Sequence, residues 1–161
     1  MKESNPFIMV VLNFQEVRRR SILVWSSIPR EKLDWRPDSQ ALTCSEMIRH
    51  VLEAEFLYHN LLVSGGSSGS ENIDNPFMLK EFTSLKDELT FIQPFRNDFL
   101  KYIGALSEKD LDEKKINRED VGYTRTLGDM LLRIAYHESV HTGQLLDYMR
   151  QMKLERPNIW D

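Results

Sequence analysis

The chain has 161 residues, a length that suits one domain, 1–161, with a sizeable core. With 41% hydrophobic and 29% charged residues it is too apolar for a disordered chain and too interrupted by charge for a membrane protein. The net charge of −4 disfavours broad binding to nucleic-acid phosphates, and the single cysteine, Cys44, excludes an internal disulfide and a cysteine-rich zinc site. No export or membrane signal is apparent, so we expect a soluble, cytoplasmic protein.

The first half of the chain contains two segments in which apolar residues recur at helical spacing. The first runs from Pro6 to Ile28, and Asn5 before it is a residue that caps the free amides of a first turn. The second begins near Cys44, where Thr43–Glu46 form a predicted capping box, and continues to about Leu61. The glycines and serines of 64–70 then predict a flexible surface loop.

The second half of the chain contains two more such segments. A third helix is predicted from Leu85 to Leu106, and Pro94 inside it predicts a kink or, alternatively, two shorter helices. The connector Ser107–Thr124 is long enough to cross the bundle or to cover one end of it, and ten of its eighteen residues are charged. A fourth helix runs from Thr126 to about Met152. Because no segment shows the period of a strand, the predicted fold is all-α, a four-helix bundle.

Helical phase divides the four histidines of the chain. His137 and His141 lie one turn apart on the apolar face of the fourth helix, and His50 lies on the apolar face of the second. His59 is rotated to the opposite side and is expected to face water. Three inward imidazoles need partners for their ring nitrogens, which a shared divalent cation would supply. We therefore predict a metal site of His50, His137 and His141 with an open coordination position, and packed core histidines are the alternative.

The segment His137–His141 also matches the H-E-x-x-H pattern of zinc metalloproteases, in which the glutamate is the general base. The extended form of that pattern requires glycine and histidine where this chain has Gln144 and Asp147. The helical period also continues past His141, and no strand is predicted to hold a peptide. The context therefore disfavours a protease, and Glu138 is either a proton acceptor beside the metal or a polar contact between helices.

Gly143 lies inside the predicted fourth helix, where glycine costs about 1 kcal/mol relative to alanine. A close approach of backbone is the usual reason for such a glycine. We therefore expect a neighbouring helix to lie against Gly143, beside the metal site.

Three motifs together resemble a known family. Leu33–Pro37 is similar to its L-x-W-R-P segment, Ser45–His50 looks like its S-x-x-E-h-x-x-H segment, and His137–Leu145 is similar to its H-x-x-x-H-x-G-Q signature. In this order they resemble the DinB/YfiT-like metalloenzyme superfamily. The resemblance implies an up-down-down-up four-helix bundle that holds a divalent metal, zinc or nickel before iron, on the same three histidines.

Characterised members of that family include transferases that attach low-molecular-weight thiols to electrophiles and a thiol-dependent isomerase. The resemblance therefore implies a metal-dependent enzyme that activates a thiol for attack on a small-molecule substrate. A metal-dependent hydrolase and a non-enzymatic, stress-induced metal-binding protein are the alternatives. The resemblance also suggests a homodimer, whereas the net charge and the many charged residues already argue against nucleic-acid and membrane partners. Because Cys44 is the one thiol of the chain, any reacting thiol is expected to come from outside.

Overall fold

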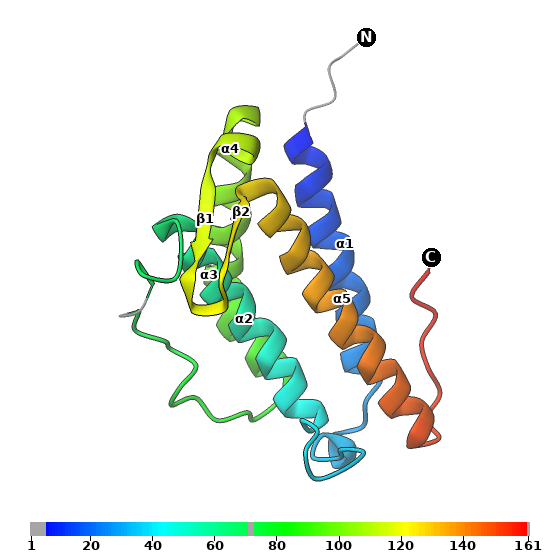
Figure 1. The fold of residues 1–161 in the computed structure, drawn as a ribbon. Helices are drawn as coiled ribbons and strands as arrows, with labels where there is room; N and C mark the ends of the chain where they lie inside the picture. The colour runs from blue at the N-terminus through cyan, green and yellow to red at the C-terminus, as the bar shows by residue number, and fades with distance from the viewer. Residues whose placement is uncertain (1–5, 71–72, 161) are drawn as a thin grey trace.

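The computed structural model describes residues 6–70 and 73–160, and four long helices account for most of them (Figure 1). They are α1 (Pro6–Ser26), α2 (Cys44–Ser64), α3 (Leu85–Gly104) and α5 (Leu127–Gln151). These helices confirm the four that the sequence predicts, although the predicted cap Asn5 lies outside the described residues. α3 continues through Pro94 as one helix, so the alternative of two shorter helices is wrong.

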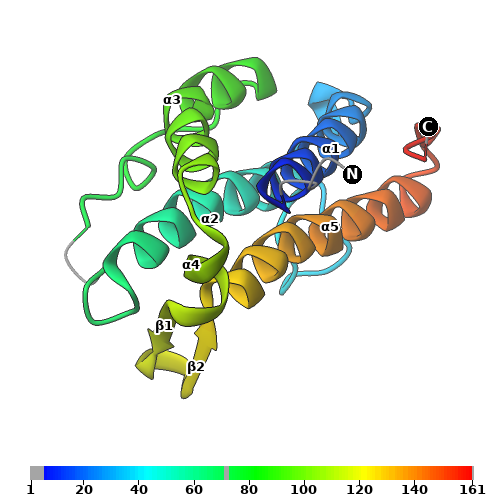
Figure 2. The same ribbon diagram turned by 90° about the horizontal axis from the view of Figure 1, so that it is seen from above.

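The chain directions of the helices give an up-down-down-up bundle. In Figure 1, α1 and α5 run downward while α2 and α3 both run upward, so the segment between α2 and α3 returns along the bundle. α1 packs against α3 and α5, and α2 packs against the same two helices, which places α1 and α2 at opposite corners (Figure 2). The predicted topology is therefore confirmed. Among the described residues, no helix combines the length and the apolar character needed to cross a membrane.

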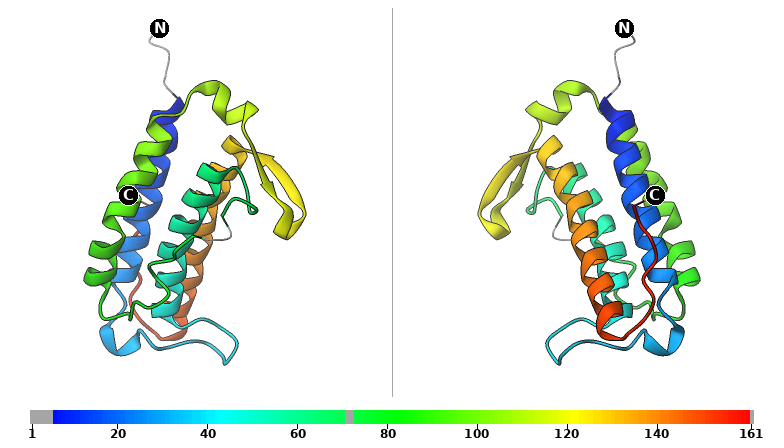
Figure 3. Two further views of the ribbon diagram at one scale, coloured as in Figure 1. Left: turned by 90° about the vertical axis from the view of Figure 1, so that its left-hand side faces the viewer. Right: turned by 90° about the vertical axis from the view of Figure 1, so that its right-hand side faces the viewer.

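The charged connector is more structured than predicted. It contains the short helix α4 (Glu108–Glu113) and an antiparallel hairpin of β1 (Lys115–Arg118) and β2 (Tyr123–Thr126). Figure 3 shows that this hairpin projects at one end of the bundle, next to the start of α5. The prediction of a chain without strands is wrong here, because strands of four residues are too short to display a period of two.

The glycine-serine segment after α2 is attached to this hairpin. The amide of Asn117 donates to the carbonyl of Gly65 (3.0 Å), and the amide of Ser67 donates to the carbonyl of Asn117 (2.9 Å). A Cβ on Gly66 would lie 2.2 Å from the Asn117 carbonyl oxygen, so only glycine fits there. At 65–67 the chain is therefore a backbone contact between α2 and β1 and not the predicted flexible loop.

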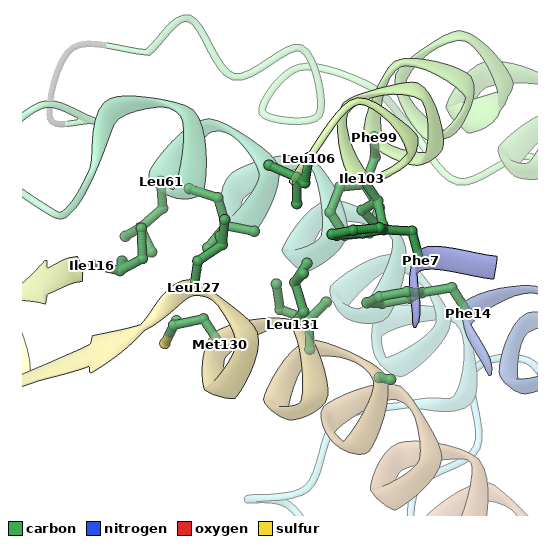
Figure 4. Packing of buried hydrophobic residues seen from close by; sticks show 13 residues of the cluster. Phe7, Phe14, Leu61, Phe99, Ile103, Leu106, Ile116, Leu127, Met130 and Leu131 are labelled. Atoms are coloured by element: carbon green, nitrogen blue, oxygen red, sulfur yellow. The ribbon is translucent and has the colours of Figure 1, made fainter. Parts of the chain in front are cut away.

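Two clusters of buried apolar side chains fill the bundle. The hairpin-end cluster lies near β1 and the start of α5, and Figure 4 shows its side chains converging from all four long helices. The second cluster, which we call the far-end cluster, fills the opposite half. Members of the hairpin-end cluster are Phe7, Phe14, Leu61, Leu62, Phe99, Ile103, Leu106, Ile116, Leu127, Met130, Leu131, Ile134 and Ala135. Members of the far-end cluster include Val24, Trp25, Ile48, Val51, Leu52, Ile92, Leu145 and Met149.

Four buried charged residues, one from each long helix, form a layer between the two clusters. On each helix the charged residue lies between residues of the hairpin-end cluster and residues of the far-end cluster. Arg18 of α1 donates through Nε and Nη2 to the two carboxylate oxygens of Glu138 of α5 (2.7 and 3.0 Å), and through Nη2 also to Glu55 of α2 (3.3 Å). Arg96 of α3 pairs with Glu55 and donates to the carbonyl of Phe14 (2.8 Å). All four charged side chains belong to residues that are at most 7% exposed. Because two positive charges face two negative charges, the layer as a whole is neutral.

Removing one member of this layer should be costly because it leaves an unpaired buried charge. Arg18→Met leaves two carboxylates facing one arginine, and we expect it to lower the free energy of unfolding by about 3–5 kcal/mol. Combining it with Glu138→Met leaves the neutral pair of Arg96 and Glu55, so the double variant should lose less than the sum of the single variants. Urea unfolding in the presence of EDTA measures this without a contribution from metal.

The exposed pair of Arg19 and Glu16 provides the matched control, since both side chains are about 40% accessible. Arg19→Met should cost less than about 1 kcal/mol. Strictly additive losses for Arg18→Met and Glu138→Met would show that the two charges do not depend on each other.

Candidate metal centre

Three of the four histidines meet at the boundary between α2 and α5. The Nε2 atom of His137 lies 3.1 Å from Nε2 of His50 and 3.1 Å from Nε2 of His141. One ligand nitrogen from each ring lies within 4.8 Å of the other two. Two nitrogens that each lie about 2.0–2.1 Å from one metal are about 3 Å apart, so the separations fit a shared cation. The three histidines are thus positioned to bind a metal ion.

The local reason for this arrangement is the spacing of the ligands on two antiparallel helices. His137 and His141 project from successive turns of α5, and His50 faces them from the first half of α2. His137 and His141 are half-buried, whereas His50 is exposed. The prediction that all three point into the core is therefore wrong for His50, and the cluster lies at the rim of the bundle, where solvent reaches it.

The fourth histidine also differs from its prediction. His59 was expected to face water, but its ring packs against Phe99 and Tyr102, with centroid separations of 5.4 and 5.3 Å. Burial lowers the pKa of His59, with a smaller opposing effect of Asp98. His59 is therefore a packed side chain on another face of α2, away from the cluster.

Lowered pKa values keep two of the histidines in the neutral form that can bind a metal. Burial, together with the neighbouring His141 and His50, lowers the pKa of His137 to about 4. Partial desolvation of its ring and the neighbouring His141 also lower the pKa of His50, although that residue is exposed to solvent. At neutral pH both rings are uncharged, and a neutral imidazole has the nitrogen lone pair that a cation needs.

Gln144 determines the tautomer of His141. Its side-chain oxygen lies 2.7 Å from Nδ1 of His141. An amide oxygen only accepts hydrogen bonds, so Nδ1 carries the proton and Nε2, which faces His137, keeps its lone pair. The glutamine of the H-x-x-x-H-x-G-Q signature thus holds the ring of His141 in the orientation that a metal ligand would need.

Glu138 does not belong to the cluster. Its carboxylate is 5% exposed and is held by Arg18 on the core side of α5. Although burial acts against it, this ion pair lowers the pKa of Glu138. Of the two alternatives for Glu138, the structure shows the contact between helices, and the carboxylate is not available as the general base of an H-E-x-x-H protease.

Cys44 is likewise separate from the cluster. It is fully buried at the first turn of α2, and burial raises the pKa of its thiol to about 11. A thiol with such a pKa is protonated at neutral pH and is a poor nucleophile. The chain therefore has no thiolate of its own to offer at the histidines.

A pocket of about 270 Å³ adjoins the cluster, with His50 and His137 in one wall. Its remaining wall is mainly apolar and comes from α2, and Arg118 of β1 also lines it. The sequence did not single out Arg118, because an arginine in a highly charged connector is expected to be an ordinary solvent-exposed side chain. It also missed Tyr58, whose ring lies 5.9 Å from that of His137. The eight-residue spacing from His50 was the available signal for Tyr58, because it places both residues on one side of α2.

The chain is similar to known proteins over most of its length. Residues 13–145 match the model of a family described as the DinB superfamily. YjoA of Bacillus subtilis (strain 168), described as an uncharacterized protein, is 23% identical over 153 residues, covering 94% of this chain and 92% of its own length. The crystal structure of the DinB-like protein YjoA from Bacillus subtilis matches with a TM-score of 0.71 at 21% identity, over 94% of this chain and 97% of that chain. This likeness shows a common fold.

Gly143 has no packing role in the structure, contrary to the expected close approach of a helix. A Cβ built at this position meets nothing within 4 Å. Gly143→Ala should therefore raise the free energy of unfolding by about 0.5–1 kcal/mol, because alanine loses less backbone entropy in a helix. Chemical unfolding of the metal-free protein measures this, and a destabilised variant would contradict the open space seen here.

Gln144→Ala should weaken metal binding without unfolding the bundle. Its side chain contacts His141 at the rim, and the loss of such an orienting partner typically costs about 10–100-fold in metal affinity. Competition with a chromophoric chelator measures the affinity. Gln151→Ala is the matched control. Gln151 lies two turns after Gln144 on α5 and also makes an exposed hydrogen bond with a side chain of its own helix, that of Asp147. Equal affinities in the two variants would show that Gln144 has no positioning role.

Proposed function

The chain belongs to the DinB superfamily, and from this premise we propose that it is a metal-dependent enzyme acting on a small molecule. In the proposal His50, His137 and His141 hold a divalent cation. The observation that carries it is the convergence of three imidazole nitrogens beside a pocket that two of the three histidines line. Because His50 is exposed and the pocket is open beside it, a substrate can approach the cluster.

The proposed cation supplies Lewis acidity, which lowers the pKa of a thiol or a water molecule that approaches it. Three neutral histidines are a donor set that leaves room for such a ligand. An all-imidazole set suits zinc and nickel, which we place first, and also iron.

We favour a thiol over water as the activated group, in a reaction of the thiol S-transferase type. Among the described residues, the potential ligand group contains three histidines and no carboxylate, and Glu138 is held by Arg18. Activation of water usually depends on a general base, whereas a free thiol, with a pKa near 8.5, needs less assistance. Since Cys44 is buried and protonated, the thiol would be a separate low-molecular-weight compound.

The residues of the chain have distinct tasks in this proposal. The histidines hold the cation, and Gln144 keeps the proton of His141 on Nδ1. The apolar side chains of α2 exclude water from one side of the reacting thiol and orient its carbon chain. The electrophile would enter from the solvent side, next to the exposed His50.

The packing of the bundle favours this role over a purely structural metal site. Both apolar clusters and the charged layer are formed by residues outside the histidine cluster. A metal that is needed for folding contributes its binding energy to the stability of the fold. We therefore expect the metal-free protein to remain folded.

The experiment begins with metal analysis of untagged protein. We expect close to one divalent ion per chain in the wild type and in His59→Ala, and a large loss in His137→Ala, which removes the central ligand. His59→Ala is the matched control, because it truncates a half-buried histidine of the same bundle that lies outside the cluster. Retention of metal in His137→Ala would refute the proposed ligand set.

The second part measures chemistry. The metal-loaded protein is incubated with several low-molecular-weight thiols and one chromogenic electrophile, and we expect product formation that disappears in His141→Ala. Circular dichroism after chelation should show an intact helical bundle. A rate that is the same with and without metal would contradict the proposed function, and loss of the helical signal on chelation would favour a structural metal.

A further inference from the structure

The pocket beside the histidines has two different ends. His50 and His137 line it from α2 and α5, whereas Arg118 lines it from β1. The other lining side chains are apolar apart from the hydroxyls of Tyr58 and Ser70, and the Ser70 hydroxyl already donates to the carbonyl of Ser67 (3.0 Å). The apolar ones are Ala54, Leu57, Leu61 and Ile73. Among the described lining residues, Arg118 is the one permanent charge and none is acidic. The volume of about 270 Å³ is slightly below the range of roughly 300–1,000 Å³ that is typical of drug-sized ligands, so the occupant is small.

The backbone holds Arg118 over this pocket. Ile116, two residues earlier on β1, is 1% exposed and belongs to the hairpin-end cluster, so the alternation of the strand turns Arg118 to the same side. Asn117, between them, is bonded through its amide and carbonyl to Gly65 and Ser67 at the end of α2. Ile116 and Asn117 thus anchor β1 directly before Arg118. The side chain of Arg118 is only 16% exposed.

The hydrogen bonds of Arg118 leave one side of its guanidinium available. Nε and Nη2 donate to the carboxylate of Asp120, the latter at 2.6 Å. Within the described part of the chain, Nη1 donates to no protein acceptor, and it is not among the buried polar atoms without a partner. Its protons are therefore accessible to a ligand. Asp120 is itself 44% exposed and does not line the pocket, so it holds the guanidinium from the outer side.

Tyr58 lies between the two ends of the pocket. Its ring is 5.9 Å from that of His137, and its phenol is one of the groups that, after Asp120 and Tyr123, raise the pKa of Arg118. The hydroxyl of Tyr58, which lines the same pocket, is a second donor. One guanidinium edge and one hydroxyl match the two oxygens of a carboxylate, whereas a phosphate dianion is usually held by more donors.

We propose that Arg118, with Tyr58, binds the carboxylate of a small thiol whose sulfur lies at the histidine cluster. The substrate class is therefore a low-molecular-weight thiol with a carboxylate separated from the sulfur by a short apolar chain. This inference rests on the proposed function, since the histidine end of the pocket is assigned by it. It adds the group that selects the thiol.

The test compares two thiols that differ in charge alone. Zinc-loaded protein is titrated by calorimetry with 3-mercaptopropionate and with its neutral counterpart 3-mercaptopropionamide. We expect the wild type to bind the carboxylate at least about tenfold more tightly, because a charge-assisted hydrogen bond is lost with the amide. Arg118→Gln should reduce this preference to within about threefold while leaving the affinity for the amide unchanged.

Two further variants separate substrate binding from a role in holding the hairpin. Arg125→Gln is the matched control, because Arg125 belongs to the same hairpin and also lies over the Tyr123 ring but does not line the pocket. It should keep the preference of the wild type. Asp120→Asn removes the carboxylate that competes for Arg118, so it should strengthen binding of 3-mercaptopropionate. If Arg118 only holds the hairpin, Asp120→Asn and Arg118→Gln will weaken both thiols alike, and the inference is wrong.

Failure of the inference can be distinguished from failure of the proposed function. Equal affinity of the two thiols in the wild type would overturn the role of Arg118 while leaving thiol binding at the histidines intact. If neither thiol binds, thiol activation is refuted, and Arg118 is tested separately by adding butyrate or butyramide to zinc-loaded, ¹⁵N-labelled protein. A shift of the Arg118 Nε–H resonance with butyrate alone supports the carboxylate site, and no shift with either compound overturns it.

Discussion

The buried layer of Arg18, Glu55, Arg96 and Glu138 is the constraint on which the rest of the structure depends. An unpaired charge in the middle of a bundle is strongly destabilising, so each long helix must be rotated to bring its charged residue to the others. That rotation also places the neighbouring residues. On α5, His137 and His141 lie about 100° and 60° to the same side of Glu138, which directs both toward α2 at the edge of the bundle.

The same rotation of α2 builds the pocket wall. His50 and Tyr58 both lie on one side of Glu55 around the helix axis, so the face of α2 that carries His50 continues as the wall of the pocket. The charged layer and the two apolar clusters are complete without a ligand, and the site lies beside them at the rim. The fold and the proposed chemistry therefore depend on adjacent but different residues: Glu138 supports the fold, and His137, the residue directly before it, lines the pocket.

The hairpin adds what a plain helical bundle lacks. Asn117 anchors the hairpin to the glycines after α2. This contact brings β1, a strand of the charged connector, to the pocket beside the histidines. Gly66 is indispensable for this contact, because any side chain there would overlap the Asn117 carbonyl. The glycine-serine composition of 64–70, which usually indicates a mobile linker, here permits a close backbone approach that positions Arg118.

The sequence by itself determined the four long helices, the capping box at Thr43 and the pairing of His137 with His141, because these depend on contacts within a turn or two of one helix. It could not reveal which residues meet across helices. Arg18 and Glu138 are 120 positions apart, and their pairing depends on how two helices are rotated against each other. Tertiary structure likewise decided that His50 is exposed while His59 is packed against aromatic rings. It also decided the hairpin, the open space at Gly143 and the position of Arg118 at the pocket. Periodicity gives the phase of a residue within its own helix, whereas what lies opposite that residue is set by the packing of the whole bundle.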